Sequence, residues 1–114
     1  MSNEVGELII GTRTVGSAVV LSVAGEVDVV SAPKLAAAVA DAASSASTLL
    51  VVDLSQVKFF GSAGLSVLVG ARETAPDLGL KVIASAQVRR PIEVTGLDKV
   101  LEVYDTLEQA LGGE

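Results

Sequence analysis

Hydrophobic and polar residues alternate along the first quarter of the chain, and this pattern predicts a pair of strands. The two segments are residues 7–14 (ELIIGTRT) and 17–24 (SAVVLSVA), with a tight turn at Val15-Gly16 between them. A period of two, as at Val19, Leu21 and Val23, is typical of a strand in a sheet. We expect the next segment, residues 25–28 (GEVD), to leave the sheet.

Helical spacing follows in residues 34–46, which are rich in alanine. Ser31 and Pro33 mark the start of this helix, because a serine hydroxyl can cap free N–H groups and proline is tolerated in a first turn. The apolar positions on one face recur four residues apart, at Leu35, Val39 and Ala43. The helix is therefore predicted to be amphipathic.

A central strand and a second helix are predicted next. Residues 48–54 (TLLVVDL) form an apolar run that Asp53 interrupts, which suits a strand covered on both faces. After the Gly61–Gly64 turn, a helix carries Leu65, Leu68, Val69 and Arg72 on one side, and Pro76 and Gly79 close it.

The last third of the chain continues the alternation of strands and helices. Residues 80–84 predict a short strand, and a helix near residues 88–95 should begin close to Pro91, because an interior proline costs about 3 kcal/mol. Gly96 ends that helix, and residues 101–104 form a last strand. A final helix opens at Thr106, with Gln109 as its capping-box partner and Gly112 past its end. The pattern indicates one α/β domain over residues 1–114, with a core at about residues 8–111.

Composition narrows the possible functions. The chain of 114 residues has no Cys and no His, which excludes disulfides, the usual zinc sites and every nucleophile system based on Cys or His. Its net charge of −6 and the absence of a dense basic run argue against direct binding of nucleic acid and leave room for a partner with a basic face. Without a signal-peptide pattern or an apolar run of about 20 residues, a soluble cytoplasmic protein is expected, with no cofactor, metal or membrane partner.

Ser62, between Gly61 and Ala63-Gly64, admits three interpretations. It can cap a helix N-terminus, which is the simplest interpretation of a serine at this position. A catalytic nucleophile is disfavoured because the string has only one of the two glycines that G-x-S-x-G requires at their offsets, and the chain has no histidine to activate the hydroxyl. Phosphorylation is the third interpretation, since a phosphate at a helix start lies beside free N–H groups and the positive end of the helix dipole. Capping and phosphorylation are compatible with each other.

Four other features are candidates for function. Asp28 is either a turn residue or a partner for an external cation, and alone the turn is favoured. Asp53 has no second carboxylate nearby in the sequence, so we expect it to bond loop backbone at a strand end rather than a metal. Arg89-Arg90 is a phosphate clamp or a solvated face. Phe59-Phe60 should place one ring inward and one at the surface, and an exposed ring beside Ser62 would suit a binding hot spot.

Together the motifs resemble the STAS domain, specifically the bacterial anti-sigma factor antagonists. The resemblance covers about residues 8–111, and its motifs stand in order at the expected spacing: Gly25–Asp28, Leu50–Leu54, Val57–Gly64 and Val88–Val100. The family implies a mixed sheet of four or five strands with about four packed helices. It also implies a regulatory protein rather than an enzyme.

The resemblance further implies partner switching. The unmodified antagonist binds an anti-sigma factor, usually an ATP-binding serine kinase, and frees a sigma factor. The kinase then phosphorylates one serine, which corresponds to Ser62, and a phosphatase resets it. The family's aspartate before this serine is Gly61 here, and its second hydroxyl is Ala63, so Ser62 is the only acceptor in the turn. The surface expected to bind the partner comprises Asp28, Phe60, Gly61, Ser62, Ala63, Gly64 and Ser85. A scaffold or ligand-sensing STAS subunit without a phospho-switch is the alternative, and the missing aspartate motivates it.

Overall fold

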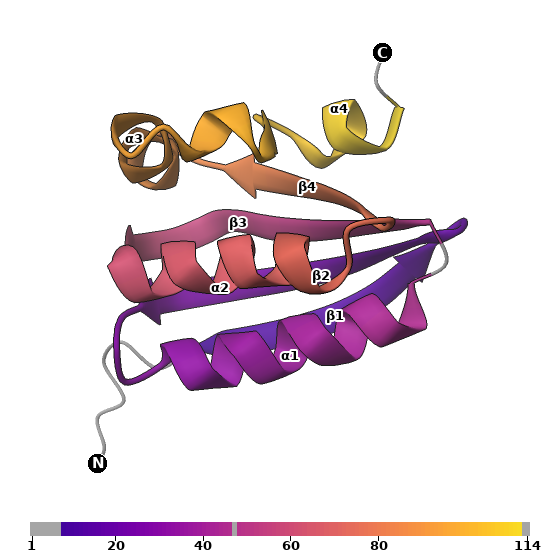
Figure 1. Cartoon of the computed structure of the whole chain (residues 1–114), viewed down its shortest axis with the longest axis horizontal. Coiled ribbons are helices and arrows are strands. Elements are labelled where there is room, and N and C mark those ends of the chain that lie inside the picture. Colours follow the sequence, from indigo (N-terminus) through magenta and orange to yellow (C-terminus); the bar gives the residue numbers. More distant parts are fainter. Residues whose placement is uncertain (1–7, 47, 113–114) are drawn as a thin grey trace.

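The protein, seen here in a computed structural model that describes residues 8–46 and 48–112, is built on one five-stranded sheet (Figure 1). The strands follow chain order across the sheet, and only the first pair is antiparallel. Their bounds are β1 (Ile9–Val15), β2 (Ala18–Val27), β3 (Leu49–Phe60), β4 (Gly79–Ala84) and β5 (Glu102–Tyr104). The described residues also form four α-helices and one 3-10 helix: α1 (Ala32–Ser45), α2 (Ser62–Thr74), α3 (Ala86–Val94), η1 (Leu97–Lys99) and α4 (Leu107–Gly112). The predicted α/β class and mixed sheet are confirmed.

The helices cover the two faces of the sheet unequally. α1 and α2 lie side by side against one face, and α3 joins them in the main hydrophobic core (Figure 1). Side chains alternate across a sheet, so the neighbouring strand residues Val20, Val51 and Ile83 face the other way. They form a smaller cluster with Ala110 of α4. Leucine, valine and alanine dominate the main core, as expected from a chain with one Tyr and two Phe.

β2 extends further than its sequence predicts. The expectation that residues 25–28 leave the sheet is wrong, because Gly25 and Val27 pair with Val57 and Phe60 of β3. The register shifts between Ser22 and Ala24 and again after Gly25. Such bulges break the period of two, which is why the alternation in the sequence fails to show the rest of the strand. Both strands therefore reach the end of the sheet where Asp28 and Gly61 follow.

α3 begins before its proline. Helix formation near Pro91 was expected, yet α3 starts at Ala86 and keeps Pro91 in its interior. Val88 and Ile92 from this helix are completely buried, which favours the helix despite the proline. The missing N–H of Pro91 leaves the carbonyl of Gln87 without its usual donor, and Gln87 is exposed to water. Gly96 ends the helix as expected, with a positive φ of 78°.

The start of α4 agrees with its sequence signature. The hydroxyl of Thr106 accepts a hydrogen bond from the N–H of Gln109 (3.1 Å). The Gln109 side chain in turn accepts one from the N–H of Asp105 (3.1 Å). This is the reciprocal bonding of a capping box, except that the Gln109 side chain accepts from the residue before Thr106 instead of from Thr106 itself. Gly112 is the last residue of α4 rather than the first beyond it.

Two glycines of α2 give opposite predictions for stability. A Cβ on Gly64 would lie 2.7 Å from a Phe60 ring carbon and 2.8 Å from Val27 Cγ1, whereas a Cβ on Gly70 would meet nothing within 4 Å. We expect Gly64→Ala to destabilise the fold by about 1–3 kcal/mol through overpacking. Gly70→Ala should stabilise it by about 0.5–1 kcal/mol through helix propensity. Urea unfolding measures both, and equal stabilities of the two variants would contradict the close packing at Gly64.

Candidate functional site

Two turns meet where β2 and β3 end. The N–H of Gly61 donates to the carbonyl of Val27 (3.0 Å), so the segment after β3 is tied to the end of β2. The two turns border a shallow depression of about 310 Å³. Its lining residues are Asp28, Val29, Phe59, Gly61, Ser62, Ala63 and Ser66. The structure thus brings together Asp28, Gly61, Ser62 and Ala63, four of the residues predicted for the partner-binding surface.

Ser62 occupies the first position of α2, and its side chain is exposed. Gly61 is the capping residue, with an extended backbone, and no side chain caps this helix. The interpretation of Ser62 as the N-cap is therefore wrong. The first N–H groups of a helix have no partner inside the helix. An exposed hydroxyl at this position stands beside unpaired donors, in the environment that favours a bound negative charge.

The two phenylalanines before the turn point in opposite directions, as expected. Phe60 is 5% exposed and belongs to the main core, whereas Phe59 is 53% exposed. Phe60 was predicted on the partner-binding surface, and the structure places it beneath that surface instead. Gly64, another predicted surface residue, is also buried, against the Phe60 ring. The exposed ring that adjoins Ser62 is that of Phe59.

Asp28 organises the turn between β2 and α1. Its Oδ1 accepts hydrogen bonds from the N–H groups of Val30 (3.0 Å) and Ser31 (2.9 Å), which confirms the expected turn role. Ser31 and Pro33 mark the start of α1 as predicted, with Ser31 at the N-cap position, but the Ser31 hydroxyl makes no cap bond to the helix. It donates instead to the carbonyl of Glu26 (2.8 Å) and accepts from the N–H of Asp28 (3.0 Å). The hydrogen bonds to the Asp28 carboxylate lower its pKa from the ordinary value of 3.8, and the N–H of Ser31 contributes most. Desolvation has a smaller effect in the opposite direction.

Ser85 lies apart from this depression. It follows β4, whose last residue Ala84 pairs with Leu54, well before the end of β3 at Phe60. Its hydroxyl oxygen is buried and has no hydrogen-bond partner among the described residues. The structure therefore does not place Ser85 among the residues around Ser62.

The other charged candidates make structural contacts. Asp53 Oδ1 accepts a hydrogen bond from the backbone N–H of Ser55 (3.0 Å), so a bond to backbone is confirmed. Both residues lie inside β3, so the expected position at a strand end beside a loop is wrong. Arg89 pairs with Asp105 at 2.7 Å, which occupies one member of the suggested phosphate clamp. In the described part of the chain, no cluster of acidic side chains that could hold a metal ion occurs.

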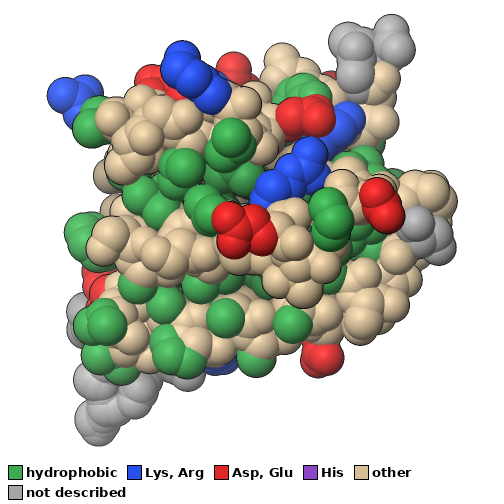
Figure 2. Space-filling view, viewed as in Figure 1, with side chains coloured by type: hydrophobic (Ala, Val, Ile, Leu, Met, Phe, Trp, Pro, Cys, Tyr) green, Lys and Arg blue, Asp and Glu red, His purple; other side chains and the backbone are tan. Residues whose placement is uncertain are grey.

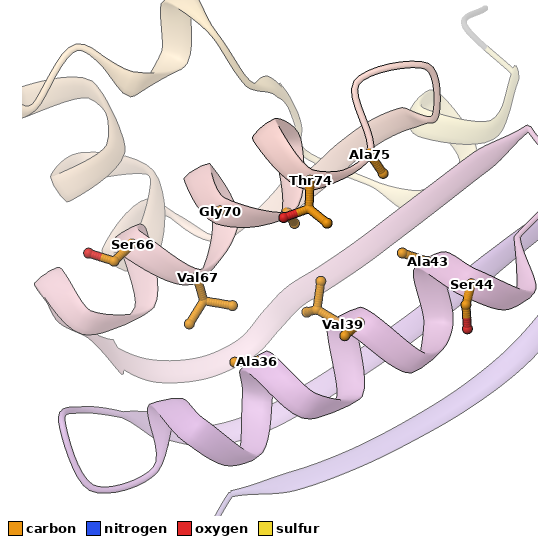
Figure 3. A pocket seen from close by; sticks show the side chains of 11 residues that line it. Ala36, Val39, Ala43, Ser44, Ser66, Val67, Gly70, Thr74 and Ala75 are labelled. Atoms are coloured by element: carbon orange, nitrogen blue, oxygen red, sulfur yellow. The ribbon is translucent and has the colours of Figure 1, made fainter.

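A groove between α1 and α2 has a volume of about 580 Å³ (Figure 3). Alanine, valine and glycine dominate its walls, with a few hydroxyl groups, and the described residues that line it carry no charge. Figure 2 shows hydrophobic side chains reaching the surface along these two helices. Ser66 borders both the groove and the depression at Ser62. The described residues that line the groove include no acid or base that could activate these hydroxyl groups. None of the described helices is long and apolar enough to cross a membrane.

Comparison with known proteins shows where this architecture occurs. The sequence matches the STAS domain family over residues 10–110. It is 41% identical over 96 residues to the anti-sigma-F factor antagonist RsfB of Mycobacterium tuberculosis, covering 82% of this chain and 79% of that protein. The crystal structure of an anti-sigma factor antagonist from Mycobacterium paratuberculosis has 37% identity and a TM-score of 0.89, covering 95% of this chain and 94% of that one. These likenesses confirm the resemblance seen in the sequence and agree with a regulatory protein that is not an enzyme.

A more distant structure shares the fold. The Bacillus cell fate determinant SpoIIAA in its phosphorylated form has 20% identity and a TM-score of 0.66, covering 90% of this chain and 96% of that one. At this identity the likeness concerns the fold alone.

The hydrogen bonds of Asp28 predict a pH dependence of stability. Because folding lowers its pKa below 3.8, ionised Asp28 stabilises the folded chain above that pH, and the contribution is lost as the pH falls through the lowered pKa. Asp28→Asn keeps an oxygen acceptor but cannot titrate. At constant ionic strength, its free energy of unfolding should therefore decline less between pH 4 and pH 2 than that of the wild type. Urea unfolding across this range measures it, with Asp41→Asn as an exposed control on α1. Identical slopes for wild type and Asp28→Asn would contradict the assignment.

Proposed function

The chain belongs to the STAS domain family, and on that premise we propose that it acts as an anti-sigma factor antagonist switched off by phosphorylation of Ser62. In the unmodified state it binds an anti-sigma factor through the surface around Ser62 and so frees a sigma factor for transcription. The observation that carries the proposal is the position of Ser62, exposed at the start of α2 and at the border of a depression. The 41% identical relative is named as an antagonist of the same kind.

Ser62 is suited to modification without loss of the fold. It contributes no cap bond to α2, so a phosphate on its hydroxyl breaks no contact that holds the helix. The phosphate oxygens would instead accept from the first free N–H groups of the helix. Ala63 and Gly64 carry no hydroxyl, which leaves Ser62 as the acceptor in this turn. The proposed kinase is the anti-sigma factor itself, with ATP as phosphate donor, and a phosphatase restores the serine.

The same phosphate would end the complex. It adds almost two negative charges at a surface that already includes the Asp28 carboxylate. Placed among the apolar contacts of the interface, the phosphate costs binding free energy, because it loses hydration there and adds bulk between closely packed surfaces. All of these steps take place in the cytoplasm, where sigma factors act.

A scaffold STAS subunit without a phospho-switch is the second candidate. The observation that favours it is Gly61, at the position where the family has an aspartate beside the acceptor. In that case Ser62 would remain unmodified, and the surface would hold a permanent partner.

Substitutions of Ser62 test the switch. With the purified anti-sigma-F factor of Mycobacterium tuberculosis as probe, we expect Ser62→Ala to bind as the wild type does and Ser62→Glu to bind at least about tenfold more weakly, a difference of about 1.4 kcal/mol. Ser44→Glu, at an exposed serine of α1, controls for the added charge and should leave the affinity unchanged. Isothermal titration calorimetry measures all four proteins. Equal affinities of Ser62→Ala and Ser62→Glu would refute the switch.

Mass spectrometry separates the two candidate functions. After incubation with the same anti-sigma factor and ATP, the wild type should gain the mass of one phosphate and Ser62→Ala should gain none. An unmodified wild type, in a mixture where the anti-sigma factor binds it and hydrolyses ATP, would favour the scaffold.

A further inference from the structure

Building on the proposed function, we infer that the anti-sigma factor docks through an apolar side chain flanked by a Lys or Arg, on a surface of Val29, Phe59 and Ala63 edged by Asp28 and Glu26. We call this the Ser62 surface.

The first observation is that two large apolar side chains are held in water beside Ser62. Val29 is 78% exposed and Phe59 is 53% exposed, and both line the depression. Val30, which follows Val29, is 83% exposed. A group of exposed apolar residues around a concave site marks an interaction surface, whereas single ones do not.

The turn that presents Val29 is rigidly built. Asp28 Oδ1 holds the N–H groups of Val30 and Ser31 at 3.0 and 2.9 Å, and the Ser31 hydroxyl ties the turn back to the carbonyl of Glu26 at 2.8 Å. The carbonyl of Asp28 also accepts from the N–H of Ala32 at 2.8 Å, at the start of α1. A turn fixed in this way loses little entropy when a partner binds, which favours affinity.

The second apolar wall depends on Gly61. A Cβ at this position would lie 3.2 and 3.3 Å from two ring carbons of Phe59, so the ring occupies the space beside the Gly61 backbone. The backbone of Gly61 is extended, with φ −90° and ψ −174°, and needs no glycine for its conformation. Glycine therefore serves the close approach of the ring, which positions an aromatic contact next to Ser62. Aromatic residues in such positions are frequent binding hot spots.

Charge at the edge of the surface selects the sign of the partner. Asp28 is the only charged residue among those lining the depression, and Glu26 is the register partner of Phe59 on the neighbouring strand. The hydrogen bonds to the Asp28 carboxylate within the described residues all reach Oδ1, and Oδ2 accepts none of them. The chain carries a net charge of −6. A basic side chain on the partner fits this edge, while its apolar neighbour enters the depression between Val29 and Phe59.

Single substitutions in the two apolar walls test the docking chemistry. With the anti-sigma-F factor of Mycobacterium tuberculosis as probe, we expect Val29→Ser and Phe59→Ala each to raise Kd at least about tenfold. Val94→Ser removes a valine of the same 78% exposure on α3 and should leave Kd unchanged. Thermal unfolding accompanies each titration and should show midpoints within a few degrees of the wild type, since the side chains removed are exposed.

A neutral variant tests the basic contact. Asp28→Asn keeps the oxygen that accepts from Val30 and Ser31 but removes the charge. We expect it to slow association and to flatten the dependence of the association rate on salt, whereas Asp41→Asn changes neither. Stopped-flow mixing at several salt concentrations gives both quantities.

The outcomes separate this inference from the function on which it rests. If the wild type binds and Ser62→Glu does not, but Val29→Ser and Phe59→Ala bind as tightly as the wild type, the docking chemistry is refuted and the antagonist function stands. An unchanged salt dependence in Asp28→Asn would refute the basic contact. A wild type that does not bind the anti-sigma factor would overturn the antagonist function and this inference with it.

Discussion

One close contact between β2, β3 and α2 positions everything at the functional end of the molecule. The N–H of Gly61 bonds the carbonyl of Val27, and the next turn brings Gly64 against Phe60 and Val27 with no room for a side chain. Because α2 starts on this contact, its first residue, Ser62, lies beside the turn that follows β2. A rotation or shift of the helix start would separate the serine from Asp28 and close the depression between them.

The site consequently has a buried support and an exposed surface that belong to adjacent residues. Phe60 and Gly64 form the support, inside the main core, while Phe59 and Ser62 face solvent. Such an arrangement provides a rigid surface. The described residues that line the depression include one carboxylate, whose Oδ1 accepts from backbone N–H groups, and the chain contains no histidine or cysteine. A surface of this kind can bind a partner, and we propose that a phosphate on its serine would change what it binds.

Much of the fold follows from local patterns in the sequence, and the exceptions occur where distant segments decide. Local sequence is enough to predict the strands, the end of α3 at Gly96 and the capping box at Thr106, because each depends on neighbouring residues. Local sequence does not predict the extension of β2, which pairing with β3 stabilises. It also does not predict the helical turn before Pro91, which burial of Val88 stabilises. Neighbouring residues of a strand point to opposite faces of the sheet, so the sequence predicts that one of Phe59 and Phe60 is buried. The register shifts between β2 and β3 determine which of the two it is. Ser62 itself could be singled out from the sequence, although its exact place, first residue of the helix rather than cap, required the geometry of Gly61.

Amide hydrogen exchange of the chain with and without the anti-sigma factor maps the bound surface without any substitution. We expect slower exchange at the N–H groups of residues 28–31 and 61–64 in the complex, and no such protection when Ser62 carries a phosphate. The groove between α1 and α2 lies outside the proposed contact, so residues 36–44 should exchange at unchanged rates. Protection confined to that groove, with none at residues 61–64, would rule out binding through the surface around Ser62.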